Sequence, residues 1–299
     1  MKKGELIAIA ILGMIFLLPF ASAGILNWIT GKASSQNLTM GADVGNTAPI
    51  ITYVAPVSAT NPVEGSTRTV TFKFTAYDHD NNNPAVHDLT DGSARAELLN
   101  GATTRSATCT IVAEDKEKTS NYTCSVDMYY WDTAASWKIN VTIKDASNAW
   151  AENSTTSFTY NSLTAFVMAP VAINWTSLSP GSTDNQATND PSVLNNTGNY
   201  ESTNIQINTT TLVGVTDNTK TIGGSNFTSK IDDPACTGTV LSEVSEYVQV
   251  ASAALPKGNL SAGSGAGQEE LYYCLDVPAS VTKQTYDTSA KGAWTVKVV

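Results

Sequence analysis

Between residues 137 and 143, apolar side chains occupy every second position and polar side chains fill the positions between them. The apolar positions are Trp137, Ile139, Val141 and Ile143. A period of two residues is what a half-buried antiparallel strand requires, because successive side chains point to opposite faces of a sheet. The same alternation runs from Thr67 to Tyr77. Both segments are therefore predicted to be core strands.

Shorter segments rich in β-branched and aromatic residues, separated by turn residues, predict the remaining strands. In the first half of the chain these are residues 49–57, 95–99, 106–112, 122–130 and 156–160, and in the second half residues 204–213, 271–277 and 294–298. A chain of 299 residues is long enough for two ordinary domains. We predict an all-β protein with two β-sandwich domains, residues 48–168 and residues 169–299. The first has the strand number and turn spacing of an immunoglobulin-like sandwich.

The composition supports sheet over helix, because only 15% of the residues are charged whereas Thr, Ser and Asn are abundant. The formal net charge is −10. Without residues 1–23 it becomes 15 minus 26, or about −11, since that segment holds two lysines and one glutamate. An acidic surface repels nucleic acid and anionic membranes, so neither is an expected partner.

Residues 1–23 have the pattern of a secretory signal peptide: Lys2 and Lys3, an apolar run, and the small-residue site Ala21-Ser22-Ala23. We expect cleavage before Gly24 and an extracellular or cell-surface location. The apolar run holds 13 residues, fewer than the roughly 20 that span a bilayer, so no stable transmembrane anchor is expected after cleavage. The alternative is a prepilin-like segment whose apolar part is kept as a filament core.

Residues 24–47 are either a flexible linker or an exposed N-terminal strand. The Gly, Ser and Asn content of the segment favours a linker. An apolar cluster in it, which could add as a strand to another subunit, favours an exposed strand. The candidate assembly residues are Ile25, Leu26, Trp28 and Ile29.

Four cysteines allow three pairings, and their spacing favours Cys109 with Cys124 and Cys236 with Cys274. No cysteine lies in a CxxC motif or at metal-ligand spacing from a histidine, so neither zinc binding nor thiol catalysis is supported. We therefore expect one structural disulfide in each domain.

Nine Asn-x-Ser/Thr sequons are candidate glycosylation sites: Asn37, Asn121, Asn140, Asn153, Asn174, Asn195, Asn208, Asn226 and Asn259. Three of them, Asn121, Asn140 and Asn208, fall on the outward side of their predicted strands. These positions predict a glycoprotein. The alternative is an unmodified surface that is simply rich in Asn.

The densest polar cluster begins at Asp78 and contains both histidines of the chain, His79 and His87. Its candidate calcium ligands are Asp78, Asp80, Asn82, Asp88 and Asp91. Calcium prefers six to eight oxygen ligands, which alternating Asp and Asn side chains can supply. The alternative is a loop stabilised by Asx turns alone. A transition metal is the less favoured interpretation of the histidines.

No residue set indicates an enzyme. Both histidines lie in one loop, and neither a GxSxG nor an HExxH motif is present. Glu269 and Glu270 are adjacent, so on a strand they face opposite sides of the sheet and cannot act as an acid and base pair.

Two short motifs resemble known families. The run Tyr130, Asp132, Ala135, Trp137, Ile139, Val141, Ile143 and Asp145 resembles the signature of PKD-like and related immunoglobulin-like domains of bacterial and archaeal surface proteins, with Ala135 where that pattern has Gly. In the second domain, Pro180-Gly181 followed by the motif at residues 195–199 resembles β-sandwich repeats of surface proteins and subunits of TasA-type filaments and archaeal bundling pili. This resemblance implies an immunoglobulin-like or jelly-roll-like second domain.

The expected function is that of a secreted structural or adhesion protein that binds cell-surface proteins, glycans or itself through sheet edges and loops. One alternative is a filament subunit assembled by donor-strand exchange from residues 24–30. Another is a carbohydrate-binding module that stacks sugars on Trp131, Trp137 or Trp150, although Trp137 is expected in the core.

Overall fold

The computed structural model describes residues 38–80, 89, 93–115, 118–243, 247–262 and 266–299. The fold is all-β, as the sequence predicts: the described residues form antiparallel sheets, and the only helices among them are two 3₁₀ turns of three residues each. Residues 46–299 form one compact unit. Within it the sheets build two sandwiches, one after the other along the chain.

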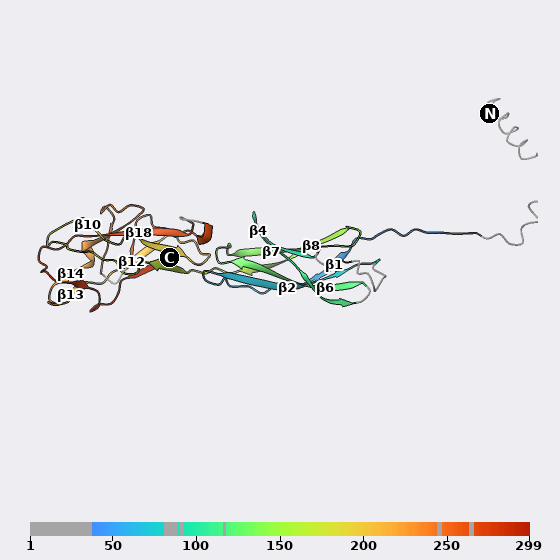
Figure 1. The fold of residues 1–299 in the computed structure, drawn as a ribbon, viewed down its shortest axis with the longest axis horizontal. Coiled ribbons are helices and arrows are strands. Elements are labelled where there is room, and N and C mark those ends of the chain that lie inside the picture. Colours follow the sequence, from blue (N-terminus) through green and yellow to red (C-terminus); the bar gives the residue numbers. More distant parts are fainter. Residues whose placement is uncertain (1–37, 81–88, 90–92, 116–117, 244–246, 263–265) are drawn as a thin grey trace, which may run out of the picture. The chain divides into compact units, whose positions relative to one another are not determined.

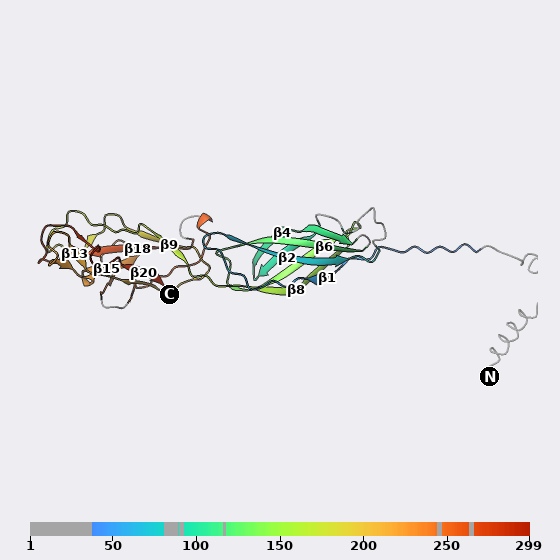
Figure 2. The same ribbon diagram turned by 90° about the horizontal axis from the view of Figure 1, so that it is seen from below.

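The first sandwich contains two sheets of four strands each. One has the order β1 (Ile50–Val54), β2 (Thr67–Tyr77), β6 (Thr119–Tyr129) and β5 (Thr110–Asp115). The other has the order β4 (Thr103–Thr108), β3 (Arg95–Asn100), β7 (Ala135–Lys144) and β8 (Trp150–Tyr160). Side chains from both sheets share one core, which includes Phe74, Leu98, Tyr122 and Trp137. The strands can be followed in Figure 1 and Figure 2.

The two strongest strand predictions correspond to β2 and β7. Along β2, Val70, Phe72, Phe74 and Ala76 are buried, and the intervening side chains are exposed or half-buried. In β7 the apolar positions are buried in the same way, but Asn140, expected to face solvent, is only 7% exposed. The pairing of β7 with β8 shifts register between Ile139 and Val141. An irregularity of this kind changes the twist and cover of a strand locally, so the alternation alone does not fix the exposure of Asn140.

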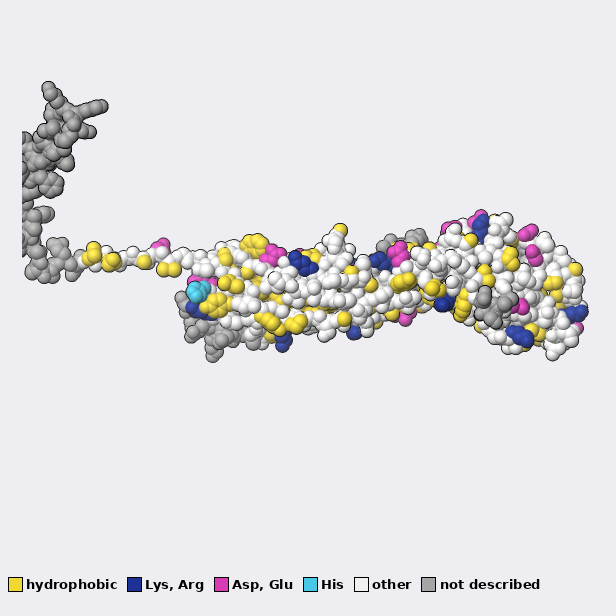
Figure 3. Space-filling view, turned by 180° about the vertical axis from the view of Figure 1, so that it is seen from behind, with side chains coloured by type: hydrophobic (Ala, Val, Ile, Leu, Met, Phe, Trp, Pro, Cys, Tyr) yellow, Lys and Arg dark blue, Asp and Glu magenta, His cyan; other side chains and the backbone are white. Residues whose placement is uncertain are grey.

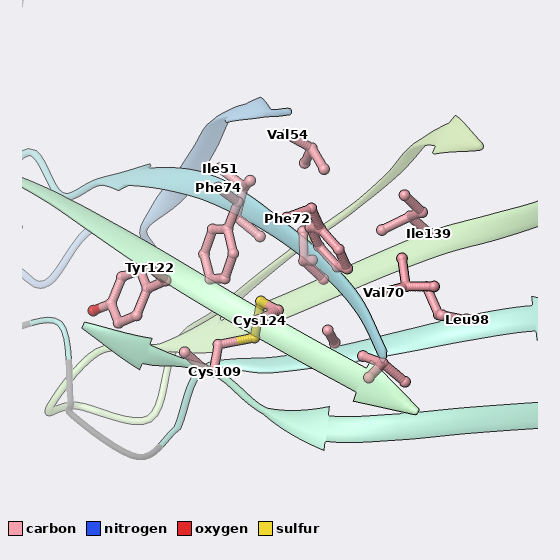
Figure 4. Packing of buried hydrophobic residues seen from close by; sticks show 14 of the residues in the cluster. Ile51, Val54, Val70, Phe72, Phe74, Leu98, Cys109, Tyr122, Cys124 and Ile139 are labelled. Atoms are coloured by element: carbon pink, nitrogen blue, oxygen red, sulfur yellow. A yellow bond between two sulfur atoms is a disulfide. The ribbon is translucent and has the colours of Figure 1, made fainter. Parts of the chain in front are cut away.

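The segment expected as one strand at residues 106–112 is instead the meeting point of two strands. β4 pairs with β3 in one sheet, whereas β5 pairs with β6 in the other, so the chain crosses between the sheets at Cys109. The disulfide between Cys109 and Cys124 ties this crossing point to β6. Figure 4 shows the bond among the buried side chains of the first core.

The second sandwich is built from shorter strands. Its largest sheet has the order β16 (Thr239–Val240), β15 (Phe227–Ile231), β18 (Gln268–Leu275), β11 (Ser192–Asn196) and β9 (Phe166–Ala169), with β10 (Asn185–Gln186) also paired to β18. Opposite it are two sheets of three strands: β17 (Val248–Gln249), β12 (Ile205–Asn208) and β20 (Thr295–Val298), and β14 (Thr221–Ile222), β13 (Leu212–Gly214) and β19 (Tyr286–Asp287).

The strand β9 pairs with β11, so the second sandwich begins a few residues before position 169, where the sequence analysis placed the boundary. Its core is a separate cluster that includes Leu194, Ile205, Phe227 and Leu271. The second predicted disulfide, between Cys236 and Cys274, is also present and attaches the loop after β15 to β18.

Candidate functional site

A groove with a volume of about 920 Å³ lies in the second sandwich. It lies between the large sheet and the two small sheets, and its apolar lining includes Met168, Trp175, Leu212, Leu275 and Trp294. Protein cores are normally packed so closely that few voids exceed the size of a water molecule. A hollow of this size lined with apolar side chains is therefore a candidate binding site.

Three polar groups of the groove are satisfied within the chain. The indole N–H of Trp175 donates to the carbonyl oxygen of Asn185 at 2.9 Å, and that of Trp294 donates to the carbonyl oxygen of Thr210 at 2.8 Å. The Tyr286 hydroxyl donates to the carbonyl oxygen of Thr282 at 3.0 Å. Because these groups already have partners, the two tryptophans offer their ring faces to a ligand. Lys283, Asp287 and several hydroxyl side chains also line the groove, so its surface is mixed, with somewhat more apolar than polar area.

Two edge strands contribute to the lining of this groove. β9 is the last strand of the large sheet, and β20 is the last strand of its small sheet. Met168 on β9 and Val296 on β20 both line the groove and are only half-buried. An edge strand can accept a further strand through its backbone, and the groove supplies space for the apolar side chains of that strand.

The motif at residues 195–199 connects the two sandwiches. The side-chain amide of Asn199 donates to the carbonyl oxygens of Asp132, at 2.9 Å, and Asn161, at 3.0 Å, while its Oδ1 accepts the N–H of Leu163 at 2.7 Å. Thr197 donates from its hydroxyl to Glu64 at 2.8 Å and accepts the N–H of Gly65 at its carbonyl oxygen. Buried hydrogen bonds of this kind fix the position of a loop, because leaving any of these groups unpaired would cost free energy.

Gly198 lies at the centre of this connection. A side chain there would collide with the carbonyl oxygen of Leu163, so the close approach of the two backbones requires glycine. Asn196 holds the same loop from the other side, donating to the carbonyl oxygens of Tyr200 and Pro256. The motif, interpreted from sequence only as a family resemblance, therefore has a structural role at the junction of the sandwiches.

The sequons differ in their surroundings. Asn174 is exposed, and Asn121 and Asn208 are half-buried on outward positions. The Oδ1 of Asn121 accepts the hydroxyl of Thr75 at 2.7 Å. Asn140 is buried and its side-chain amide faces Glu97 at 3.4 Å, so a glycan on Asn140 does not fit the folded sheet. Asn37 lies outside the described residues, and occupancy of the other sequons stays a prediction.

Only part of the candidate calcium loop can be placed, because Asn82, Asp88 and Asp91 lie outside the described residues, as does His87. Asp78 is buried, and its Oδ1 accepts the N–H of Asp80 at 3.4 Å. Side-chain hydrogen bonding with Asp78 and the hydrogen bond that the N–H of Thr47 donates lower the pKa of Asp80. Within the described ranges no three acidic, His or Cys side chains gather as a metal site, and calcium binding stays a prediction.

Burial changes the titration of two carboxyl groups in the second sandwich. Desolvation raises the pKa of Asp190, which accepts the N–H of Tyr273 at 2.8 Å, and it raises the pKa of Glu269 in the same way. On the face shown in Figure 3, acidic and basic side chains are scattered among larger areas without charged groups.

The remaining candidates divide between the core, the surface and the undescribed part of the chain. Trp137 is fully buried, as expected, whereas Trp150 is 57% exposed and Trp131 is half-buried. The candidate assembly residues, Ile25, Leu26, Trp28 and Ile29, lie outside the described residues. Among the residues that the structure describes, no helix is both long and apolar enough to cross a bilayer.

Sequence reasoning did not find the groove. Its lining comes from segments distant in sequence, and Trp175 and Trp294 are half-buried aromatic residues that no local pattern distinguishes from core residues. No family model matches this chain, and no curated protein matches its sequence. The groove and the junction of the two sandwiches are therefore the structural features that bear on function.

Proposed function

We propose that this protein is a secreted structural or adhesion component of a cell surface, and that it binds an extended apolar segment of a partner in the groove of its second sandwich. The groove carries this proposal: more of its lining is apolar than polar, its volume is about 920 Å³, and the edge strands β9 and β20 border it. A partner strand can bond to an exposed sheet edge through its main chain and place alternate side chains in the groove.

Two further observations support the extracellular setting and the scaffold. Both disulfides suit an oxidising compartment, since cytosolic proteins rarely keep such bonds. In the first sandwich, β1-β2-β6-β5 faces β4-β3-β7-β8. This order corresponds to the ABED and CFG sheets of an immunoglobulin domain with β4 added beside the third strand, and it supports an immunoglobulin-like assignment.

The accessibility of the groove can be tested with 8-anilinonaphthalene sulfonate, a dye that fluoresces on apolar surfaces. The protein starting at residue 24 should bind the dye while natively folded, and tryptophan emission should change as Trp175 and Trp294 are covered. Val296→Glu should abolish binding by placing in the groove a negative charge that repels the sulfonate of the dye. Val167→Glu is the matched control, because Val167 is 51% exposed on an edge strand and does not line the groove. Absence of dye binding to the native protein would refute an open groove.

A second candidate function is that of a filament subunit, in which the bound segment is residues 24–30 of another copy. The groove favours it because that segment is short and apolar, and residues 31–47 can extend to about 56 Å, enough to reach a neighbouring subunit. Light scattering coupled to size-exclusion chromatography should then show polymers that disappear on deletion of residues 24–30 and in Val296→Glu. A monomer that still binds the dye would reject the filament and retain the adhesion protein.

A further inference from the structure

A second, smaller recess lies where the end of β6 meets the second sandwich, and its volume is about 350 Å³. Three consecutive aromatic residues, Tyr129, Tyr130 and Trp131, line one side of it. The rings of Tyr129 and Trp131 stack with centroids 4.5 Å apart, and Tyr130 meets Trp131 at right angles with centroids 4.7 Å apart. The recess is therefore partly walled by aromatic rings.

This aromatic wall is held firmly in place. The guanidinium of Arg105 lies 4.7 Å from the centroid of the Tyr129 ring and makes an ion pair with the buried carboxylate of Asp132. Asp132 also accepts the N–H of Tyr129 at 2.8 Å, and the Tyr130 hydroxyl accepts the N–H of Leu260 at 3.4 Å. Because Arg105 and Asp132 neutralise each other, the recess carries no net charge from this pair.

Hydroxyl groups surround the aromatic wall. Ser66, Thr67 and Ser261 line the recess, and among the residues that the structure describes their hydroxyls and the indole N–H of Trp131 make no hydrogen bond within the chain. These four groups can donate hydrogen bonds, and the hydroxyls can also accept them. A ligand that matches the recess is therefore small and uncharged, with an apolar C–H face and several hydroxyl groups.

We infer that the recess binds a neutral pyranose unit of a surface glycan, with Trp131 contacting the C–H face of the sugar and Ser66, Thr67 and Ser261 bonding its hydroxyls. The negative face of an aromatic ring attracts polarised C–H groups, and the neutral recess disfavours charged sugars. This site is separate from the apolar groove and does not depend on the function proposed for it. It narrows the sequence-based carbohydrate alternative to Trp131, since Trp137 is in the core and Trp150 has no ring contact among the described residues.

Isothermal titration calorimetry on the protein starting at residue 24 tests the inference, with methyl glycosides of glucose, galactose, mannose and N-acetylglucosamine and their short oligomers as probes. Binding to at least one is expected, with a Kd of about 1 mM for a single sugar unit. Trp131→Ala should weaken it at least tenfold, whereas Trp150→Ala, which removes an exposed tryptophan, should leave Kd unchanged. The groove variant Val296→Glu should also leave Kd unchanged.

Since Trp131→Ala could disturb the junction, Ser66→Ala and Ser261→Ala provide a milder test. Each removes one hydroxyl, and each should weaken binding about fivefold while the midpoint of thermal unfolding stays within experimental error. Failure of every probe to bind below about 10 mM, or equal affinity in wild type and Trp131→Ala, would overturn the proposal. In that case the aromatic cluster only packs the junction.

Discussion

The two sandwiches have the same general architecture, but they fill their interiors differently. Trp137, the largest side chain of the first core, is fully buried, whereas Trp175 and Trp294 of the second are half-buried beside an open groove. Of the twelve largest fully buried side chains among the described residues, nine belong to the first sandwich and three to the second. The first sandwich therefore buries more of its large side chains, whereas the second keeps half-buried tryptophans beside an open groove.

Strand length explains much of this difference. β2, β6 and β8 have 11 residues each and β7 has 10, so their alternating apolar positions cover the whole core. In the second sandwich the longest strand, β18, has 8 residues and several have only two. Short strands leave more of the chain in loops, whose positions depend on side-chain hydrogen bonds instead of a continuous ladder. Such loops can surround a hollow without collapsing into it.

Replacing one tryptophan of each core by alanine should show the difference in packing between the two cores most clearly. Trp137→Ala removes a fully buried ring, and we expect it to lower the free energy of unfolding by about 3–5 kcal/mol. Trp294→Ala removes a half-buried ring at the groove and should cost about half as much, since less apolar area is lost. Guanidinium denaturation followed by circular dichroism measures both. Trp150→Ala is the control and should stay within about 0.5 kcal/mol of wild type.

If Trp294→Ala proved as costly as Trp137→Ala, the interior of the second sandwich would be as tightly packed as the first. The groove would then be closed in solution, and the contrast drawn between the two sandwiches would fail.

The two disulfides close loops of different length, which gives a second comparison. The separation is 15 residues for Cys109 and Cys124 and 38 residues for Cys236 and Cys274. On the chain-entropy model their loss costs about 3 and nearly 4 kcal/mol respectively. The double Cys→Ser variant of the second pair should therefore destabilise its sandwich more, and because that core is looser, its unfolding should separate from that of the first sandwich. Calorimetric scans of both variants measure this, and a single shared transition in both would argue against it.

The parts of the fold that the sequence predicts are those governed by local alternation. The strand expected at Thr67 to Tyr77 is β2 with the same bounds, and the cysteine spacing gives both disulfides. The exposure of Asn140 could not be predicted from the sequence, because it depends on a register shift between β7 and β8. The crossing at Cys109 depends on the pairing of β4 and β5 with strands of two different sheets. The groove depends on side chains that the fold brings together from six or more segments. Such features arise from tertiary pairing, for which a single sequence carries no periodic signal.

The connection between the sandwiches can be broken at Gly198. Gly198→Ala places a methyl group against the backbone of Leu163, and the resulting overpacking should cost about 1–3 kcal/mol. The hydrogen bonds of Asn199 and Thr197 should weaken with it, so hydrogen exchange at Gly65 and Leu163, whose N–H groups bond to this loop, should accelerate. Gly45→Ala is the matched control, because no atom lies within 4 Å of a Cβ there. Unchanged exchange in Gly198→Ala would show that the loop does not lock the junction.

The smallest expected effect concerns Asp190 and its dependence on pH. Burial raises the folded-state pKa of this carboxyl group, so the folded protein favours the neutral form. Below the pKa of the unfolded state, near 3.9, the neutral carboxyl group contributes its full stabilisation of the fold. This contribution is lost as the pH rises through the pKa of the folded state. Asn at this position is always neutral and still offers an oxygen to the N–H of Tyr273. Asp190→Asn should therefore raise the unfolding midpoint by about 1–3 °C at pH 7 and have little effect at pH 3.

Glu201→Gln, at an exposed carboxylate, should show no such difference. A lower midpoint for Asp190→Asn at pH 7 would mean that the second sandwich uses the charge of Asp190, and that this part of its interior is more polar than the groove beside it.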